Sequence, residues 1–165
     1  MKSMKVSVDV ELQNPYEYTS IPEASDCQLW VEAALSKIEY NAPCTLVIRF
    51  VDEAEGRSLN HSYRNKNCAT NVLSFPYEAS EFELAIPELE NNHIGDLVLC
   101  EEVVIREAKV QDKDTLQHWA HLIIHGTLHL NGYDHLNDDE AETMESLEIS
   151  ILKKLGYQNP YKISS

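Results

Sequence analysis

The amino-acid sequence predicts an α+β fold in which a single mixed β-sheet of about four strands is covered by helices. Two observations support this fold class. Short apolar segments typical of strands alternate with longer segments of helical periodicity, and their order along the chain is β-α-β-α-β-β-α-α-α. A chain of 165 residues is long enough to bury one core. No repeat or low-complexity linker interrupts it, so we expect residues 1–165 to form one domain.

The N-terminal part is expected to form a strand, a helix and a second strand. Residues 6–12 alternate between apolar and polar side chains, which predicts a half-buried strand. Pro22 fits the first turn of a helix over residues 22–38. Residues 45–51, TLVIRFV, have the composition of the second strand. The apolar stripe expected on the helix consists of Leu29, Trp30, Ala33, Ala34, Leu35 and Ile38.

A second helix is predicted to begin at Asp52 and to end near Arg64. Asp52 is suited to cap the first turn, because its carboxylate can accept a hydrogen bond from a backbone N–H there. Arg64 then opens a polar loop, RNKNCAT, over residues 64–70. Residues 71–75, NVLSF, predict a short strand that ends at Pro76.

The remaining segments predict an acidic connection, one more strand and three helices. Residues 77–93 are acidic and weakly patterned, which favours a long surface loop or a decorated hairpin. Residues 94–100 predict a strand, and 101–111 and 112–130 predict helices, the second capped at Asp112 or Asp114. The last helix, 138–155, has acids at its start, Lys153 and Lys154 at its end, and Gly156 after it.

Composition excludes several classes of protein. The net charge is −15, from 28 acids and 13 bases, which argues against non-specific nucleic-acid binding. The segment from Arg57 to Phe75 is nevertheless free of acids and contains three bases. No apolar segment approaches the length of a membrane span, and the first residues contain no apolar leader. We therefore place the protein in the cytoplasm, without a membrane partner.

Three histidines have the spacing of a metal site. His125 and His129 are four residues apart, so on a helix they lie on one face. Gly132 allows the chain to turn back, and His135 can then approach from the following loop. Three imidazoles with one open position are how catalytic zinc is usually held. His121 and His118 lie close to the same face; we expect His121 to support the site or the core, and His118 to be exposed.

The residue after the first ligand separates this site from ordinary zinc peptidases. The ligand spacing and turn glycine match the H-E-x-x-H-x-x-G-x-x-H frame, which predicts a zincin-like metal site. Gly126 occupies the position of the glutamate that accepts the proton of water in those enzymes. The pattern therefore favours a metal-dependent reaction other than ordinary peptide hydrolysis.

The segment H-G-x-L-H-L-x-G-Y-D-H, here His125 to His135, resembles the signature of the YbeY family of bacterial endoribonucleases that mature ribosomal RNA. Further matches are Leu59-Asn60 with Tyr63-Arg64, the segment TNVLSFP, and Gly95-Asp96. The helix end Leu155-Gly156-Tyr157 also matches, so the resemblance covers most of the chain from about residue 45. Two positions depart from the family pattern: Ala69, where proline is usual, and Asn131, where an apolar residue is usual.

The resemblance implies one zinc ion per chain held by His125, His129 and His135, with His125 and Arg64 in catalytic roles. It implies cleavage of single-stranded RNA in ribosomal RNA maturation, at the 3′ end of 16S ribosomal RNA, and in ribosome quality control. The implied partners are ribosomal RNA precursors, the small ribosomal subunit and its assembly proteins. A guanidinium suits such a role because it binds a phosphate through two N–H groups.

Several alternatives remain open at this point. The protein could hydrolyse another substrate with its metal, or it could be a non-catalytic ribosome-assembly factor in which zinc is structural. Asp134 could orient a ligand imidazole or cap the turn. Ser74 is expected to be a strand serine near the cleft, since it lacks the elbow motif of a nucleophile. The general base, the nucleophile, the cleavage site and the oligomeric state are not defined by the sequence.

Overall fold

The computed structural model describes residues 6–64, 71–78, 85, 92–134 and 136–161, without the side chains of residues 63 and 64. The predicted acidic segment 77–93 therefore falls largely outside the described residues. In the described part, one mixed four-stranded sheet is combined with five helices, so the α+β prediction is confirmed. No described helix is long and apolar enough to cross a membrane.

The sheet has the strand order β1-β2-β4-β3. Strands β1 (Val8–Gln13), β2 (Cys44–Val51) and β4 (His93–Cys100) run parallel, and β3 (Val72–Pro76) pairs antiparallel with β4 at one edge. Each strand lies within about two residues of its predicted position, because apolar alternation reports directly on which side chains are buried.

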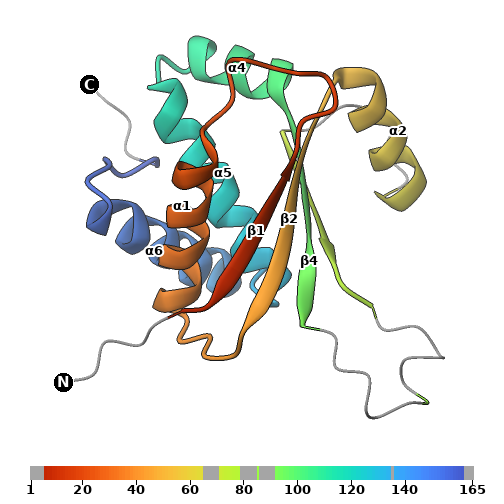
Figure 1. The fold of residues 1–165 in the computed structure, drawn as a ribbon. Helices are drawn as coiled ribbons and strands as arrows, with labels where there is room; N and C mark the ends of the chain where they lie inside the picture. Colours follow the sequence, from red (N-terminus) through yellow and green to blue (C-terminus); the bar gives the residue numbers. More distant parts are fainter. Residues whose placement is uncertain (1–5, 65–70, 79–84, 86–91, 135, 162–165) are drawn as a thin grey trace.

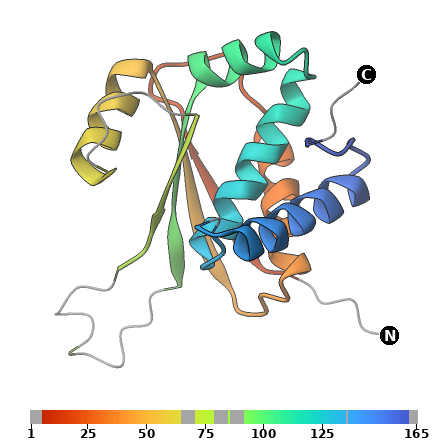
Figure 2. The same cartoon turned by 180° about the vertical axis from the view of Figure 1, so that it is seen from behind.

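Helices cover the two faces of the sheet unequally. Helices α1 (Ala24–Lys37) and α5 (Thr115–Leu130) pack on one face, with α6 (Asp138–Lys154) outside them, whereas α2 (Glu53–Arg64) lies on the other face (Figures 1 and 2). Helix α4 (Glu101–Val110) connects β4 to α5. The larger core lies on the α5 face, and α5 is therefore the central helix of the fold.

The alternation of β2 shows how the two faces differ. Ile48 and Phe50 are fully buried beneath the helices, and the indole of Trp119 on α5 meets the Phe50 ring edge-on at a centroid distance of 5.5 Å. Between them, Arg49 points to the opposite face, where its Nε donates to Glu55 at 2.7 Å. At β2, the face that carries α5 is therefore apolar, and the face that carries α2 is partly polar.

Helix ends largely follow the predicted caps. Asp52 accepts from the N–H of Glu55 at 2.8 Å, and Asp114, the second of the two candidates, accepts from the N–H of Leu116 at 2.8 Å. Gly156 follows α6 with φ 93°. The first helix is a correction: α1 begins at Ala24, so Pro22 precedes the helix instead of lying in its first turn.

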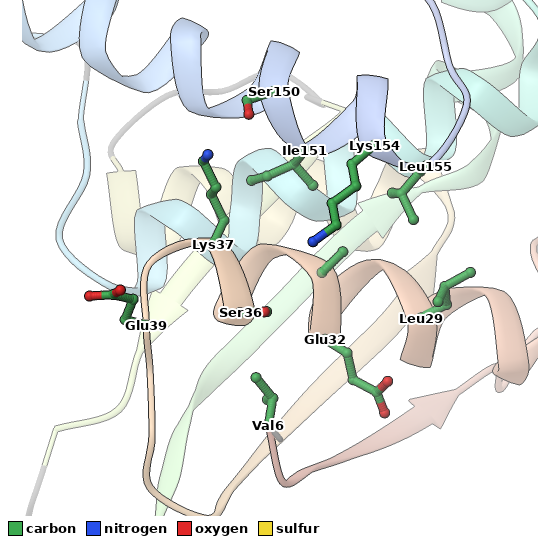
Figure 3. Close-up of a pocket in the computed structure, with 11 residues that line it drawn as sticks. Val6, Leu29, Glu32, Ser36, Lys37, Glu39, Ser150, Ile151, Lys154 and Leu155 are labelled. Carbon is green, nitrogen blue, oxygen red and sulfur yellow. The ribbon is translucent and has the colours of Figure 1, made fainter. Parts of the chain in front are cut away.

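Leu29 was predicted to face the core, and this prediction is wrong. Its side chain is 51% exposed, because the buried stripe of α1 follows Cys27, Trp30 and Ala34 and leaves Leu29 on the flank. There it borders a groove of about 650 Å³ between α1 and α6, whose rim carries charged side chains including Lys154 (Figure 3). None of the residues that line this groove is a histidine, so it is separate from the site described next.

Candidate metal centre

Helix α5 positions four histidines along one side. Its other side is largely apolar and lies in the core through residues such as Trp119, Ile123 and Ile124. Because 3.6 residues make a turn, side chains three or four apart recur on one stripe. The histidine stripe of α5, formed by His118, His121, His125 and His129, therefore runs along the helix beside its buried face.

His125 and His129 lie next to each other, as predicted. Their ring centroids are 4.5 Å apart and the ring planes are nearly perpendicular, at 82°. The side chain of His125 is 22% exposed, and His129 is also half-buried. Two imidazoles one turn apart at the edge of the core are a suitable pair for one metal ion.

The chain turns sharply at the end of α5. Gly132 has φ 92°, its N–H donates to the carbonyl of His129 at 3.0 Å, and the N–H of Tyr133 donates to that of Leu128 at 3.2 Å. This is the Schellman arrangement, which favours glycine at the left-handed position. The side chain of Asn131 caps the same turn by donating to the carbonyl of Thr127 at 2.8 Å. The predicted turn is thus confirmed.

A buried carboxylate from α6 holds two of the histidines. Glu148 is 0% exposed, and its Oε1 lies 2.6 Å from Nε2 of His121. Nδ1 of His125 lies 3.2 Å from Oε2 of the same carboxylate. Burial alone would raise the pKa of Glu148, but the hydrogen bonds from both histidines outweigh it and lower the pKa to about 2. The carboxylate is therefore ionised and accepts from both rings.

A tyrosine near the C-terminus completes this cluster. The hydroxyl of Tyr161 donates to Glu148, at 2.8 Å from Oε1 and 3.1 Å from Oε2. Its ring meets His121 edge-on, with a centroid distance of 5.3 Å. Burial and the charge of Glu148 both raise the pKa of Tyr161, so the hydroxyl keeps its proton.

Gly126 faces the sheet. A Cβ at this position would lie 2.7 Å from Cδ2 of Leu97 and 3.3 Å from Oγ of Ser74. The hydroxyl of Ser74 donates to the carbonyl of Gly126 at 3.4 Å, so Ser74 is a strand serine that contacts α5. A glutamate would require the β4 side chain to move. Gly126 therefore packs closely against the sheet, at the position where zinc peptidases carry their glutamate.

The other predicted site residues have different outcomes. His135 lies outside the described residues, and no group of three or more potential ligands is found among the residues that are described. Arg64 ends α2, on the face of the sheet opposite α5, and its side chain is not described. The catalytic role of Arg64, the three-histidine ligand set and the orienting role of Asp134 all stay predictions.

His118 is a correction. It was predicted to be exposed, but it is only 5% exposed, because Nε2 pairs at 3.0 Å with Oε1 of Glu107 on α4. His121 was expected to support the site or the core, and its contact with Glu148 agrees with that expectation.

Sequence reasoning did not identify Glu148 as part of the site. Among the acids of the last helix, only Asp138, Asp139 and Glu140 at its start were interpreted, as side chains that suit a helix N-terminus. The available signal was its position between Met144 and Ile151, because residues four and three apart place Glu148 on the same buried stripe. A lone carboxylate on an apolar helix stripe requires a buried partner.

Comparison with known proteins identifies the family of this chain and its fold. The family model described as "Endoribonuclease YbeY" matches residues 11–156. A protein of Pseudomonas savastanoi pv. phaseolicola named "Endoribonuclease YbeY" is 51% identical over 154 residues, which cover 93% of this chain and 88% of that protein. The solution structure of TM1509 from Thermotoga maritima shares the fold, with a TM-score of 0.55 and 18% identity over 93% of this chain and 99% of that one. This chain belongs to the YbeY family.

Proposed function

We propose that this protein is a zinc-dependent endoribonuclease that cleaves single-stranded RNA during ribosomal RNA maturation, at the 3′ end of 16S ribosomal RNA, and in ribosome quality control. Family membership supports the reaction class. The expected setting is cytoplasmic, with the small ribosomal subunit and its assembly proteins as partners. The proposed unit is one domain over residues 1–165.

One observation carries the metal part of this proposal. Nδ1 of His125 is held by the ionised carboxylate of Glu148, while the ring stacks edge-on against His129. Metal-bound histidines normally donate their second ring nitrogen to a carboxylate or a carbonyl, which fixes the tautomer and the ring orientation. The donor set therefore fits zinc, which His125 would bind through Nε2, together with His129 and His135.

The roles of the chain's own residues follow from this arrangement. When bound, zinc supplies a Lewis acid for a phosphoryl oxygen and makes a water molecule more acidic. His125, His129 and His135 would hold the ion, and the guanidinium of Arg64 would bind a phosphate of the RNA through two N–H groups. Gly126 offers no general base, so another group must accept the proton of the nucleophile.

The proposed activity is tested with a fluorescent single-stranded RNA and the same sequence as a duplex. Zinc-loaded protein is expected to cut the single strand, to lose activity on chelation, and to regain it with added zinc. His129→Gln should be inactive. His118→Gln is the matched control on the same helix and should remain active, because the amide can still donate to Glu107. Undiminished cleavage by chelated protein or by His129→Gln would contradict the proposed mechanism.

The role of Arg64 requires a separate readout. If it binds substrate phosphate, Arg64→Ala should lower kcat/KM for RNA and leave the affinity for zinc unchanged, because α2 lies on the other face of the sheet. A loss of zinc binding in this variant would instead indicate a structural role. Unchanged kcat/KM would remove Arg64 from the catalytic residues.

A non-catalytic assembly factor is the second candidate, and the net charge of −15 favours it, since an acidic surface suits basic ribosomal proteins. The two candidates differ in cells that lack the endogenous protein. A folded His129→Gln variant that restores ribosomal RNA maturation would indicate that catalysis is not the biological role. The absence of the general-base glutamate at Gly126 argues against a third candidate, a peptidase.

A further inference from the structure

The chain after α6 folds back onto α5. Gly156, with φ 93°, ends α6, and the side-chain amide of Gln117 on α5 donates to the carbonyl of Gln158 at 3.0 Å. Pro160 is buried. We call residues 155–161 the C-terminal strap; Figure 2 shows it leaving the end of α6 and returning toward α5.

The strap places one polar group into the buried cluster. The hydroxyl of Tyr161 reaches both oxygens of Glu148, and the ring covers the edge of His121. The carboxylate of Glu148 thus receives hydrogen bonds from three side chains on two segments: His121 and His125 from α5, and Tyr161 from the strap. A fully buried carboxylate is stable only when its oxygens are satisfied in this way.

The orientation of His125 depends on the hydrogen bonds that Glu148 receives. Its Nδ1 lies 3.3 Å from Oε1 and 3.2 Å from Oε2, so it is shared between both oxygens of Glu148. The torsion of a terminal carboxylate is broad, with no steep intrinsic preference. The donors on Glu148 therefore decide its plane, and its plane decides the direction in which the imidazole of His125 points.

We propose that the C-terminal strap is a positioning element of the metal centre: Tyr161 fixes Glu148, and Glu148 fixes His125 for metal binding. This inference rests on the proposed zinc site. Neither Tyr161 nor Glu148 touches the metal or the substrate in this arrangement. Both are positioning residues, and their effect is expected in metal affinity and ligand geometry.

The test compares Tyr161→Phe with a matched control, Tyr16→Phe. Both tyrosines are about equally exposed, at 42% and 41%, and both hydroxyls donate to a glutamate. Tyr16 donates to Glu55 at 2.6 Å, on the polar face of the sheet. Zn²⁺ affinity is measured by competition with a chromophoric chelator, and Co²⁺ is used as a spectroscopic probe of ligand geometry.

Tyr161→Phe is expected to lower Zn²⁺ affinity by about tenfold, at the lower end of the range for groups that orient metal ligands. The visible absorption of the Co²⁺-loaded variant should change in position or intensity. Tyr16→Phe should match the wild type in both measurements. Glu148→Gln, which removes the charge and one acceptor position, should lose more affinity than Tyr161→Phe.

The outcomes separate this inference from the proposed function. If the wild type binds neither Zn²⁺ nor Co²⁺, the proposed metal centre fails, and the inference fails with it. If the wild type binds and Tyr161→Phe keeps the same affinity and spectrum, only the positioning role is overturned. Should Tyr161→Phe prove unfolded, Gln117→Ala loosens the strap without touching Glu148, and an unchanged Zn²⁺ affinity in that variant also overturns the inference.

Discussion

Helix α5 carries a histidine–glutamate pair toward each end, and the two pairs differ in what surrounds them. His118 is 5% exposed and pairs with Glu107, which also accepts from the side-chain amide of Asn71 at 3.0 Å. His125 is 22% exposed, pairs with Glu148, and lies beside a second imidazole, that of His129. The first pair joins α4, α5 and the start of β3, and the second presents a fixed ring at the edge of the core.

The difference shows that a histidine–carboxylate pair does not by itself indicate a metal site. In the first pair, Nδ1 of His118 is buried without a hydrogen-bond partner among the described residues, so a metal has no access to it. In the second pair, the His125 ring is partly exposed, and the imidazole of His129 lies next to it. Accessibility and a neighbouring imidazole therefore distinguish the pair at the proposed metal site from the structural pair.

The largest expected difference between the pairs is in stability. Glu148→Ala leaves two histidines at the edge of the core without their acceptor, and we expect a loss of about 3–5 kcal/mol in the free energy of unfolding. Glu107→Ala should cost about 1–2 kcal/mol, because Glu107 is 32% exposed and water can replace it. Urea unfolding of both variants measures this. Equal losses would show that the two pairs are energetically alike.

Metal addition should act through one pair only. Zinc that binds the folded state raises the free energy of unfolding by about 2.7 kcal/mol when its free concentration is 100 times Kd. We expect this increase in the wild type and in His118→Gln, and not in His129→Gln. Thermal unfolding with and without zinc provides the measurement. If zinc raised the free energy of unfolding of His129→Gln as much as that of the wild type, the metal would bind at another part of the molecule.

The smallest effect concerns pH and the first pair. Burial raises the pKa of Glu107, but the hydrogen bonds from His118 and Asn71 outweigh it, so the folded-state pKa lies below the ordinary value of 4.5. A lowered pKa means that Glu107 contributes stability above pH 4.5, and that this contribution is lost as the pH falls through the folded-state pKa.

The stability difference between wild type and Glu107→Gln should therefore stay constant from pH 7 to 5, at roughly 1 kcal/mol. Below pH 4.5 the difference should narrow. Urea midpoints across this range test the direction. A difference that widened at acidic pH would mean that Glu107 is more easily protonated in the folded state, and the interpretation of this pair would be reversed.

Features set by neighbouring residues were predictable from the sequence. The caps at Asp52 and Asp114 and the turn at Gly132 depend on hydrogen bonds within a few residues, and the structure contains all of them. The His125–His129 pair is also local, since one helical turn separates its members. Fold class followed from the order of the segments.

Features set by long-range packing were not predictable in this way. The exposure of His118 was misjudged because its partner, Glu107, comes from another helix, and the role of Glu148 was missed because the histidines it holds lie more than 20 residues away. Leu29 was misplaced because apolar character alone does not define which flank of α1 faces the sheet. The strand order β1-β2-β4-β3 likewise depends on contacts between distant segments.

The close contact between Gly126 and β4 has a consequence for how such sites evolve. A single substitution to glutamate would recreate the zinc peptidase motif in the sequence, yet the new Cβ would meet Leu97 at 2.7 Å. Because this contact is with the end of a flexible side chain, the first step toward that motif requires the Leu97 side chain to shift. The effect of a substitution at position 126 is therefore expected to depend on the residue at position 97, which couples a change on α5 to a change on β4.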